Sequence, residues 1–452
     1  MRPPDKYQLL LILFILSFAL RLGYIFEMRG HPSFLRLGRG LDSYHFHEEA
    51  EKISSGDTLL KEKEFYQAPL YSYFLAAVYS AFNKNLQAAR VCQAFLSSLG
   101  VLLVFLLAFQ YSQRKTASFF SAIVWAFYGP SLFYDGLILK TSFILFQIFL
   151  LMIFIYPFIV KDTRGLLCGF FAGSLITTRP NFAVLVPFLT GLKLLYPAKK
   201  TSGWKQLALF LAGALVLPGL FFIRNATLGQ PWFKLSSVGP RAVIQGQIPD
   251  DTRIGWDDSS RGDRMLHETQ GDLKKVISLL QEEIRKEPMI WLRLQKQKLK
   301  AFFSWYEYPN NYNFYLAKKD SFSLKMSFIS FIPVLIFTLC AFFISGRNFQ
   351  HKALFACIFM IVFLCVFPFY PFSRFRMPLA AVLSIPSGIF VLTFFQVLKK
   401  KNITSSFLFV FITAVSFFYP AYLSRHFHLV REIDYFNYGN YYLECRLTGE
   451  SE

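Results

Sequence analysis

The feature that most constrains this chain is the alternation of long apolar runs with short basic clusters. The chain has 452 residues, of which 54% are hydrophobic and only 17% are charged, against about 25% charged in a typical soluble domain. One soluble core could not bury this much apolar surface, so the sequence predicts an integral membrane protein. The net charge of +20 is concentrated in the connections, as the positive-inside rule describes. No nucleic-acid-binding motif accompanies it, so we predict no nucleic-acid partner.

Hydropathy predicts an all-α polytopic membrane protein with about eleven transmembrane helices. They cover residues 7–27, 87–110, 116–134, 138–160, 165–179, 181–196, 205–225, 324–344, 353–371, 377–397 and 404–422. The fifth and sixth are short and are separated by Arg179-Pro180, so one bent hairpin is an alternative. The apolar segment 69–82 is too short to span a bilayer and suits an interfacial or re-entrant position.

Basic clusters in alternate connections predict which side of the membrane each connection occupies. We expect these clusters and the N-terminus in the cytoplasm, which puts the outer loops 28–86 and 227–322 outside. This gives a membrane module over 1–423, in the cytoplasmic (inner) membrane, and an extracytoplasmic tail over 424–452. The long loop contains two predicted amphipathic helices, 272–286 and 289–304, separated by Pro288. In the tail, 434–444 resembles either a first tetratricopeptide helix or an isolated amphipathic helix.

Seven ionisable residues fall inside or at the ends of predicted spans, all toward the outer side. A charge at membrane depth costs about 2.5–3.5 kcal/mol, so such residues normally face a water-filled cavity or a partner. For Arg21 alone we favour a side chain that snorkels to the headgroups. Taken together, the seven predict a cationic, outward-facing cavity suited to a lipid phosphate or pyrophosphate. They are Arg21, Asp135, Lys140, Arg179, Arg224, Arg374 and Arg376.

Asp42 opens an acidic, histidine-bearing segment directly after the first span, at the mouth of this predicted cavity. Neighbouring arginines would keep its carboxylate ionised, as a general base requires. A carboxylate base beside phosphate-binding cations fits transfer of a group from a lipid phosphate to a hydroxyl or amine. The alternative is that Asp42 caps a helix over the residues that follow. The two roles are compatible.

The sequence predicts no metal-dependent site built on histidine or cysteine. His45 and Glu49 share a helix face, with His47 and Glu48 nearby, but they do not form HExxH and no second cluster completes a site. The six cysteines contain no CxxC pair, so neither a disulfide framework nor a zinc site is expected. No cofactor is predicted, and a divalent cation at Asp42 stays open.

Eight short motifs, each weak alone, occur in an order and spacing that resemble a known family. The chain resembles bacterial membrane glycosyltransferases of the GT-C superfamily. It is most similar to relatives of the protein O-mannosyltransferases (glycosyltransferase family 39), in the branch often fused to tetratricopeptide repeats. The motifs are the LDS…GD segment at 41–57, FYQAPLY at 65–71, ARVxQA at 89–94, FYDGxxLKT at 133–141, the RPN turn at 179–181, RN at 224–225 with Gly229, EYPNN at 307–311, and RFRMP at 374–378.

One segment departs from the family pattern. Relatives carry a Gly- and Asn-rich stretch after the RN motif, where this chain reads SVGPRAVIQGQ over 237–247. The asparagines are missing, and Gly239, Gly246 and Gln245 are the nearest equivalents. The contacts to the donor sugar, and hence the sugar itself, therefore do not follow from the resemblance.

The resemblance implies a mechanism and roles for individual residues. A polyprenyl-phosphate-linked sugar enters from the outer leaflet, Asp42 deprotonates an acceptor, and the acceptor attacks the anomeric carbon with inversion. The acceptor is a protein, a lipid or a glycan. The residues expected at the donor phosphate are Arg179, Arg224, Arg374, Arg376 and Lys140, and those expected to line the cavity or contact substrate are Asp135, Tyr66, Gln67, Asn225 and Glu307.

Two rival functions remain at this point. A transporter or flippase of lipid-linked glycans would also need cations at membrane depth. Such proteins often carry internal repeats, and this sequence shows none. A non-catalytic assembly subunit would use the outer loop and tail as docking surfaces, and it would tolerate Asp42→Asn.

Overall fold

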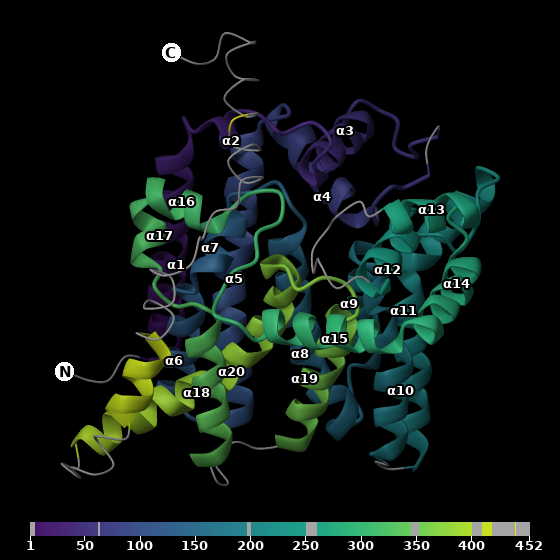
Figure 1. Cartoon of the computed structure of the whole chain (residues 1–452). Coiled ribbons are helices and arrows are strands. Elements are labelled where there is room, and N and C mark those ends of the chain that lie inside the picture. The colour runs from purple at the N-terminus through teal and green to yellow at the C-terminus, as the bar shows by residue number, and fades with distance from the viewer. Residues whose placement is uncertain are drawn as a thin grey trace.

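The computed structural model describes residues 5–61, 64–196, 200–249, 260–344, 352–399, 409–417 and 439. These residues form helices and no strand (Figure 1). The helices are α1 (Lys6–Met28), α2 (Pro32–Leu35), α3 (Asp42–Ser54), α4 (Leu70–Phe82), α5 (Leu86–Ser112), α6 (Lys115–Ala126), α7 (Gly129–Asp135), α8 (Thr141–Lys161), α9 (Gly165–Thr178), η1 (Pro180–Val184), α10 (Leu185–Leu195), α11 (Lys200–Thr227), α12 (Gly239–Gln247), α13 (Ser260–Thr269), α14 (Leu273–Lys286), α15 (Pro288–Phe302), α16 (Phe314–Asp320), α17 (Phe322–Met326), α18 (Phe331–Ile344), α19 (Lys352–Val366) and α20 (Ser373–Lys399).

The membrane character predicted from hydropathy is confirmed. Among the described residues, five helices are long and apolar enough to cross a bilayer: Lys6–Met28, Leu86–Ser112, Thr141–Lys161, Gly203–Thr227 and Ser373–Lys399. Shorter apolar helices accompany them, among them α4, which covers the segment predicted to be too short to span. The chain is therefore an all-α polytopic membrane protein, although the count of eleven spans stays a prediction.

Two of the predicted spans are not continuous helices, and the points at which they are interrupted lie against each other. The span at 116–134 divides into α6 and α7 around Gly129-Pro130, and the span at 324–344 divides into α17 and α18. The two interruptions pair with each other: the Gly129 amide donates to the Ile329 carbonyl at 2.9 Å, and the Ile329 amide donates to the Phe127 carbonyl. Backbone groups freed within a membrane must be satisfied inside the protein, and here each break satisfies the other.

Close packing of α9 against α11 fixes the positions of two predicted arginines. Gly169 and Gly213 lie against the backbone of the opposite helix, where a Cβ would have no space. Small residues at such contacts let membrane helices approach closely. Arg179 follows the last residue of α9, because Pro180 disfavours helical backbone at the residue before it and leaves Arg179 extended. Arg224 lies near the end of α11.

Helices α3 and α4, from the loop 28–86, and α13, from the loop 227–322, lie toward one end of the bundle in Figure 1. The two predicted amphipathic helices are confirmed as α14, with Asp272 as its N-cap, and α15, which begins at Pro288. The short helices α12 and α13 were not predicted. With α14 they bury a small separate cluster of Ile244, Met265 and Val276.

The C-terminal predictions lie mostly outside the described residues. The span at 353–371 ends early, at Val366, because Pro368 follows, and the chain then runs to Ser373 without a helix. Of the last predicted span, only 409–417 are described, and they are helical. The tail helix at 434–444 and the division at residue 423 fall outside the described ranges and stay predictions.

Candidate functional site

Asp42 lies in the first turn of α3 and is held by three segments that are remote in sequence. Its Oδ1 accepts a hydrogen bond from Gln67 Nε2 at 2.5 Å, and its Oδ2 lies 2.5 Å from Arg374 Nη1. The Asn311 amide donates to the same Oδ2 at 3.5 Å. The alternative role as an N-cap is not adopted, because Leu41 occupies that position and no side chain caps the helix. Asp42 is therefore a half-buried carboxylate with both oxygens engaged.

The surroundings of Asp42 keep it ionised. Burial alone would raise its pKa. The guanidinium of Arg374, with smaller contributions from Lys140 and Asn311, outweighs that effect and holds the pKa of Asp42 below its ordinary value. The carboxylate consequently carries its charge throughout the neutral range.

Arg179 and Lys140 place two further positive charges beside this pair. Arg179 is 8% exposed, and its guanidinium lies 3.9 Å from the centroid of the Phe375 ring. Lys140, at the N-cap of α8, lies over the Phe46 ring at 5.6 Å. Both interact electrostatically with Asp42 and with Arg374. Within the described part of the chain, neither side chain has a hydrogen bond or an ion pair.

This cluster, which we call the Asp42 site, carries more positive than negative charge. Arg179, Lys140 and Arg374 surround one carboxylate, and Glu49 acts on Lys140 more weakly than Asp42 does. The site lies at the N-terminal ends of α8 and α20, where helix dipoles add partial positive charge. Buried cations without a counter-ion are costly, so the geometry favours an anion at this position.

Tyr66 lines the Asp42 site next to Gln67. Its ring lies 4.7 Å from the ring of His45, one helical turn after Asp42 on α3. Its carbonyl accepts hydrogen bonds from Ser236 Oγ at 2.9 Å and from the Val238 amide. These bonds join the first outer loop to the second directly beside the carboxylate.

Arg224 and Asn225 are placed elsewhere and organise the outer loops. Arg224 donates to the carbonyls of Leu59 and Leu60 at 2.8 and 2.6 Å, and to Gln230 Oε1 at 2.7 Å. Asn225 Nδ2 donates to the Lys234 carbonyl at 2.7 Å. These donors are already committed to protein oxygens, so the structure does not bring the two residues to the Asp42 site.

Arg376 and Glu307 form a buried ion pair at 2.7 Å, each 1% exposed. Arg376 also donates to the carbonyls of Phe302 and Ser304, while Glu307 accepts from Ser373 Oγ. The pair fastens the loop after α15 to the first turn of α20. In doing so it fixes the position of Arg374, two residues earlier, although it does not itself reach Asp42.

Asp135 is likewise committed to a structural pair. Its Oδ2 lies 2.8 Å from Arg21 Nε, and its Oδ1 accepts from Ser142 Oγ at 2.5 Å. Arg21 is 0% exposed, so the prediction that it snorkels to the headgroups is wrong. The two charges neutralise each other within the helix bundle.

Two residues of the Asp42 site were not among the sequence predictions. Asn311 closes the EYPNN motif, and its left-handed backbone (φ 68°) directs the chain past Asp42. Phe375 separates Arg374 from Arg376 and supports the Arg179 guanidinium. The motif order contained both residues, but only the fold shows which of their neighbours face the carboxylate.

His47, on α3, is engaged with a hydroxyl and a carboxylate of the protein. His47 Nδ1 lies 2.7 Å from the Tyr79 hydroxyl, and its Nε2 faces Glu51. Over the described ranges, no three His, Cys, Asp or Glu side chains come together as metal ligands.

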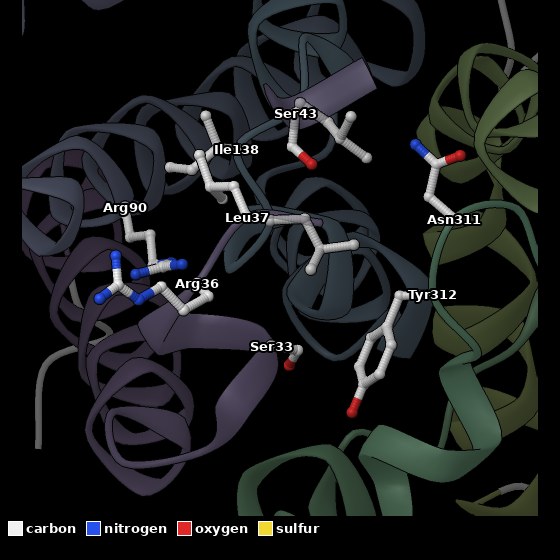
Figure 2. Close-up of a pocket in the computed structure, with 10 residues that line it drawn as sticks. Ser33, Arg36, Leu37, Ser43, Arg90, Ile138, Asn311 and Tyr312 are labelled. Carbon is white, nitrogen blue, oxygen red and sulfur yellow. The ribbon is translucent and has the colours of Figure 1, made fainter. Parts of the chain in front are cut away.

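A small pocket adjoins the Asp42 site (Figure 2). Its volume is about 20 Å³, room for roughly one water-sized group. Ser43 and Asn311 form one end of the pocket, and Arg36 and Arg90 form the other, with Leu37 between the ends (Figure 2). The pocket therefore connects the residues next to Asp42 with two arginines.

The helical architecture defines the class of protein, an all-α polytopic membrane protein. Its overall fold is similar to that of the oligosaccharyltransferase of Archaeoglobus fulgidus in the apo form. The TM-score is 0.50 and the identity 14%, over 93% of this chain and 55% of that chain. At this identity the similarity is evidence for the fold and not for the activity.

Two other solved structures are similar to the chain. One is the archaeal oligosaccharyltransferase AglB from Archaeoglobus fulgidus in complex with an inhibitory peptide and a dolichol-phosphate, at a TM-score of 0.49 and 13% identity over 92% of this chain and 55% of that one. The other is ArnT from Cupriavidus metallidurans bound to undecaprenyl phosphate. Its TM-score is 0.48 and the identity 13%, over 84% of this chain and 60% of that chain. The chain thus spans little more than half the length of these structures.

A comparison of the sequence with protein families gives one match. Residues 66–222 match the family described as dolichyl-phosphate-mannose-protein mannosyltransferase. This confirms the family resemblance that the motifs indicated. The matched stretch contains Gln67, Lys140 and Arg179 and excludes Asp42 and Arg374. No curated protein matches the chain by sequence.

Proposed function

We propose that this protein is an inverting glycosyltransferase that moves a sugar from a polyprenyl-phosphate-linked donor to an acceptor at the extracytoplasmic face of the inner membrane. The observation that carries the proposal is the Asp42 site, where a half-buried, ionised carboxylate adjoins the buried Arg179 and the half-buried Lys140, which form no ion pair with any described residue. The match to a lipid-phosphate sugar transferase family supports the same chemistry. The hexose or pentose transferred stays open.

The donor phosphate occupies the position that the charge distribution leaves for an anion. The side-chain N–H groups of Arg179 and Lys140 donate no hydrogen bond to any described residue. Arg374 can exchange its contact with Asp42 for one with phosphate. An arginine fork suits phosphate oxygens. We no longer assign Arg224 and Arg376 to the phosphate, because their donors bind backbone carbonyls and Glu307.

Donor binding then prepares Asp42 for catalysis. When Arg374 turns to the phosphate, Oδ2 of Asp42 loses its ion-pair partner and its basicity rises. Gln67 keeps the carboxylate oriented through Oδ1. Asp42 is thus free of its ion pair with Arg374, and able to act as a base, only when the donor is bound.

In the reaction, Asp42 takes the proton of the acceptor hydroxyl or amine as that atom attacks the anomeric carbon. The bond between the anomeric carbon and the phosphate oxygen breaks, and its electron pair leaves with polyprenyl phosphate. Arg179, Lys140 and Arg374 stabilise the charge that grows on the leaving phosphate, which is usually a large part of catalysis. Attack from the face opposite the phosphate inverts the anomeric centre.

The test is transfer from radiolabelled polyprenyl-phosphate sugars in membranes, comparing wild type with Asp42→Asn at matched expression. A general base contributes about 10²–10⁴-fold, so Asp42→Asn should reduce transfer by that factor. Glu51→Gln, on an exposed carboxylate of the same helix, is the matched control and should retain transfer.

Equal transfer by wild type and Asp42→Asn would exclude Asp42 as the base. If no donor supports transfer while lipid-linked glycan crosses the bilayer, the protein is a transporter and the proposal is wrong. If neither process occurs, and Asp42→Asn leaves the cell's glycans unchanged, the chain is an assembly subunit.

A further inference from the structure

Helix α12 is fastened at both ends to the segments that hold the carboxylate of Asp42. At its start, Ser236 Oγ and the Val238 amide donate to the Tyr66 carbonyl at 2.9 and 3.2 Å. Tyr66 directly precedes Gln67, whose side chain binds Oδ1 of the carboxylate. The start of α12 is therefore joined to the first of the two segments.

The last turn of α12 is joined to the chain that leads into Arg374. The Tyr370 hydroxyl donates to Gln245 Oε1 at 2.8 Å. Gly246 lies so close to the same segment that an added Cβ would stand 2.6 Å from the Pro368 carbonyl oxygen. Arg374 follows Tyr370 by one helical turn and binds the other oxygen of the carboxylate. The end of α12 therefore contacts the second of the two segments.

Lys298, on α15, bonds α12 to that second segment. It is 2% exposed, and its Nζ donates to the Gly246 carbonyl at 2.7 Å and to the Pro368 carbonyl at 2.9 Å. Burial lowers its pKa to about 7, and it forms no ion pair with any described residue. Burying an ammonium without a carboxylate costs stability. The two bonds are therefore better explained by where they place the bonded segments than by the stability they add.

The chain on the other side of Arg374 is held separately. The Ser373 amide donates to the Tyr308 carbonyl at 2.9 Å, and its Oγ donates to Glu307 at 2.5 Å. The backbone of Arg374 is thus held from both sides. Only its side chain has to move when it exchanges Asp42 for the donor phosphate.

We infer that Gly246 and Lys298 are positioning residues, which set the backbone from which Arg374 reaches Asp42 and the donor phosphate. For the phosphate the inference rests on the proposed function, whereas the contact with Asp42 can be tested without catalysis. It also gives a role to the segment that departs from the family pattern. Its Gln245 and Gly246 contact the chain before Arg374.

The first measurement needs no catalysis and follows the protonation of Asp42. Infrared spectra of the full-length protein in lipid nanodiscs are recorded against pH, and subtracting those of Asp42→Asn isolates its carboxyl band. In Gly246→Ala the new Cβ should displace Pro368, and Arg374 with it. The pKa of Asp42 should then rise by about one unit, because a neighbouring cation lowers a carboxyl pKa by about 1–3 units. Gly246→Ala changes no charge, so only a displacement can produce this shift.

A second variant and two controls accompany this measurement. Lys298→Met removes both bonds and should also raise the pKa of Asp42, although Lys298 is not among the charges that act on Asp42. Lys296→Met, on an exposed lysine of the same helix, should leave that pKa unchanged. Gly219→Ala, where an added Cβ meets no atom within 4 Å, should leave it unchanged as well.

The second measurement is the pH dependence of sugar transfer by the same variants. The acid limb of kcat/KM should move to higher pH in Gly246→Ala and Lys298→Met. At its optimum, kcat/KM should fall by about tenfold to a hundredfold, because a small misplacement of a charged group is costly in catalysis. Both controls should keep the wild-type profile.

The outcomes separate failure of the inference from failure of the proposed function. If the pKa of Asp42 keeps its wild-type value in either Gly246→Ala or Lys298→Met, that residue only supports the fold and the inference is wrong. A wild-type pH profile in both variants would overturn it for the reaction. If no donor yields transfer while both pKa shifts occur, the proposed function has failed and the positioning of Arg374 at Asp42 stands.

Discussion

The buried charges of this protein fall into two regions with opposite character. In one region, Arg21 pairs with Asp135 and Arg376 pairs with Glu307, and each partner is almost wholly buried. In the other, Arg179 and Lys140 adjoin the Asp42–Arg374 pair and form no ion pair of their own with the described residues. The first region is paired within the protein, whereas the described side chains of the second carry an excess of positive charge, which in the proposed function the donor phosphate neutralises.

This difference separates structural charge from functional charge. A buried ion pair adds little net stability by itself, but removing one member leaves the other uncompensated. Replacing Arg21 or Arg376 alone should therefore lower the stability of the protein, because it leaves a buried carboxylate without its partner. Arg179 lies over Phe375 at the end of α9, and in the proposed function it contacts the donor phosphate.

The largest expected effect is on the stability of the paired region. Asp135→Asn leaves Arg21 buried and unpaired, which should cost about 3–5 kcal/mol. Thermal or denaturant unfolding in nanodiscs measures it. Glu64→Gln breaks an exposed pair with Lys234 and should cost about 0–1 kcal/mol. Replacing both partners, in Arg21→Met with Asp135→Leu, should restore most of the stability. Unchanged stability in Asp135→Asn would remove the distinction between the two regions.

A smaller effect is expected for Lys140, on donor binding rather than on stability. Lys140→Met removes one charged donor from the Asp42 site and should raise the KM for the lipid-linked donor by about tenfold to a hundredfold. Lys84→Met, on an exposed lysine outside the site, serves as the control. Because Lys140 also stabilises the leaving phosphate in the proposed reaction, a lower kcat would agree with the same role, whereas unchanged KM and kcat would exclude Lys140 from the donor phosphate.

The pH dependence of catalysis tests the link between Arg374 and Asp42. The cation lowers the pKa of the carboxylate, so its removal should raise that pKa. In Arg374→Met the acid limb of kcat/KM should move to higher pH by about one unit or more. The loss of activity then occurs as pH falls through the raised pKa, where Asp42 becomes protonated. An acid limb that does not move would mean that the titrating group is not Asp42.

The sequence could predict which residues carry charge at membrane depth, but not which of them share a site. Asp42, Gln67 and Arg374 were assigned from motifs, and the structure brings them together. Arg224 and Arg376 carry the same charge in similar positions. Their partners are backbone carbonyls and a carboxylate that only tertiary packing brings within reach.

The fold was predictable where one local signal was sufficient. Apolar length marked the long spans, and Pro288 marked the start of α15. The paired interruptions at 127–129 and 327–330 were not predictable, because each break is stabilised by the other, about 200 residues away. The short helix α12 has no continuous apolar signal, and its buried face packs on elements of the same outer loop.

The most direct test of the two-region account compares Arg179→Gln with Arg21→Gln in two assays, polyprenyl phosphate binding and thermal unfolding. We predict that Arg179→Gln weakens binding by about tenfold or more and leaves the unfolding midpoint near that of wild type. Arg21→Gln should lower the midpoint, while the folded fraction binds polyprenyl phosphate with wild-type affinity. Normal lipid affinity in Arg179→Gln, or loss of stability equal to that of Arg21→Gln, would contradict the assignment of Arg179 to the donor phosphate.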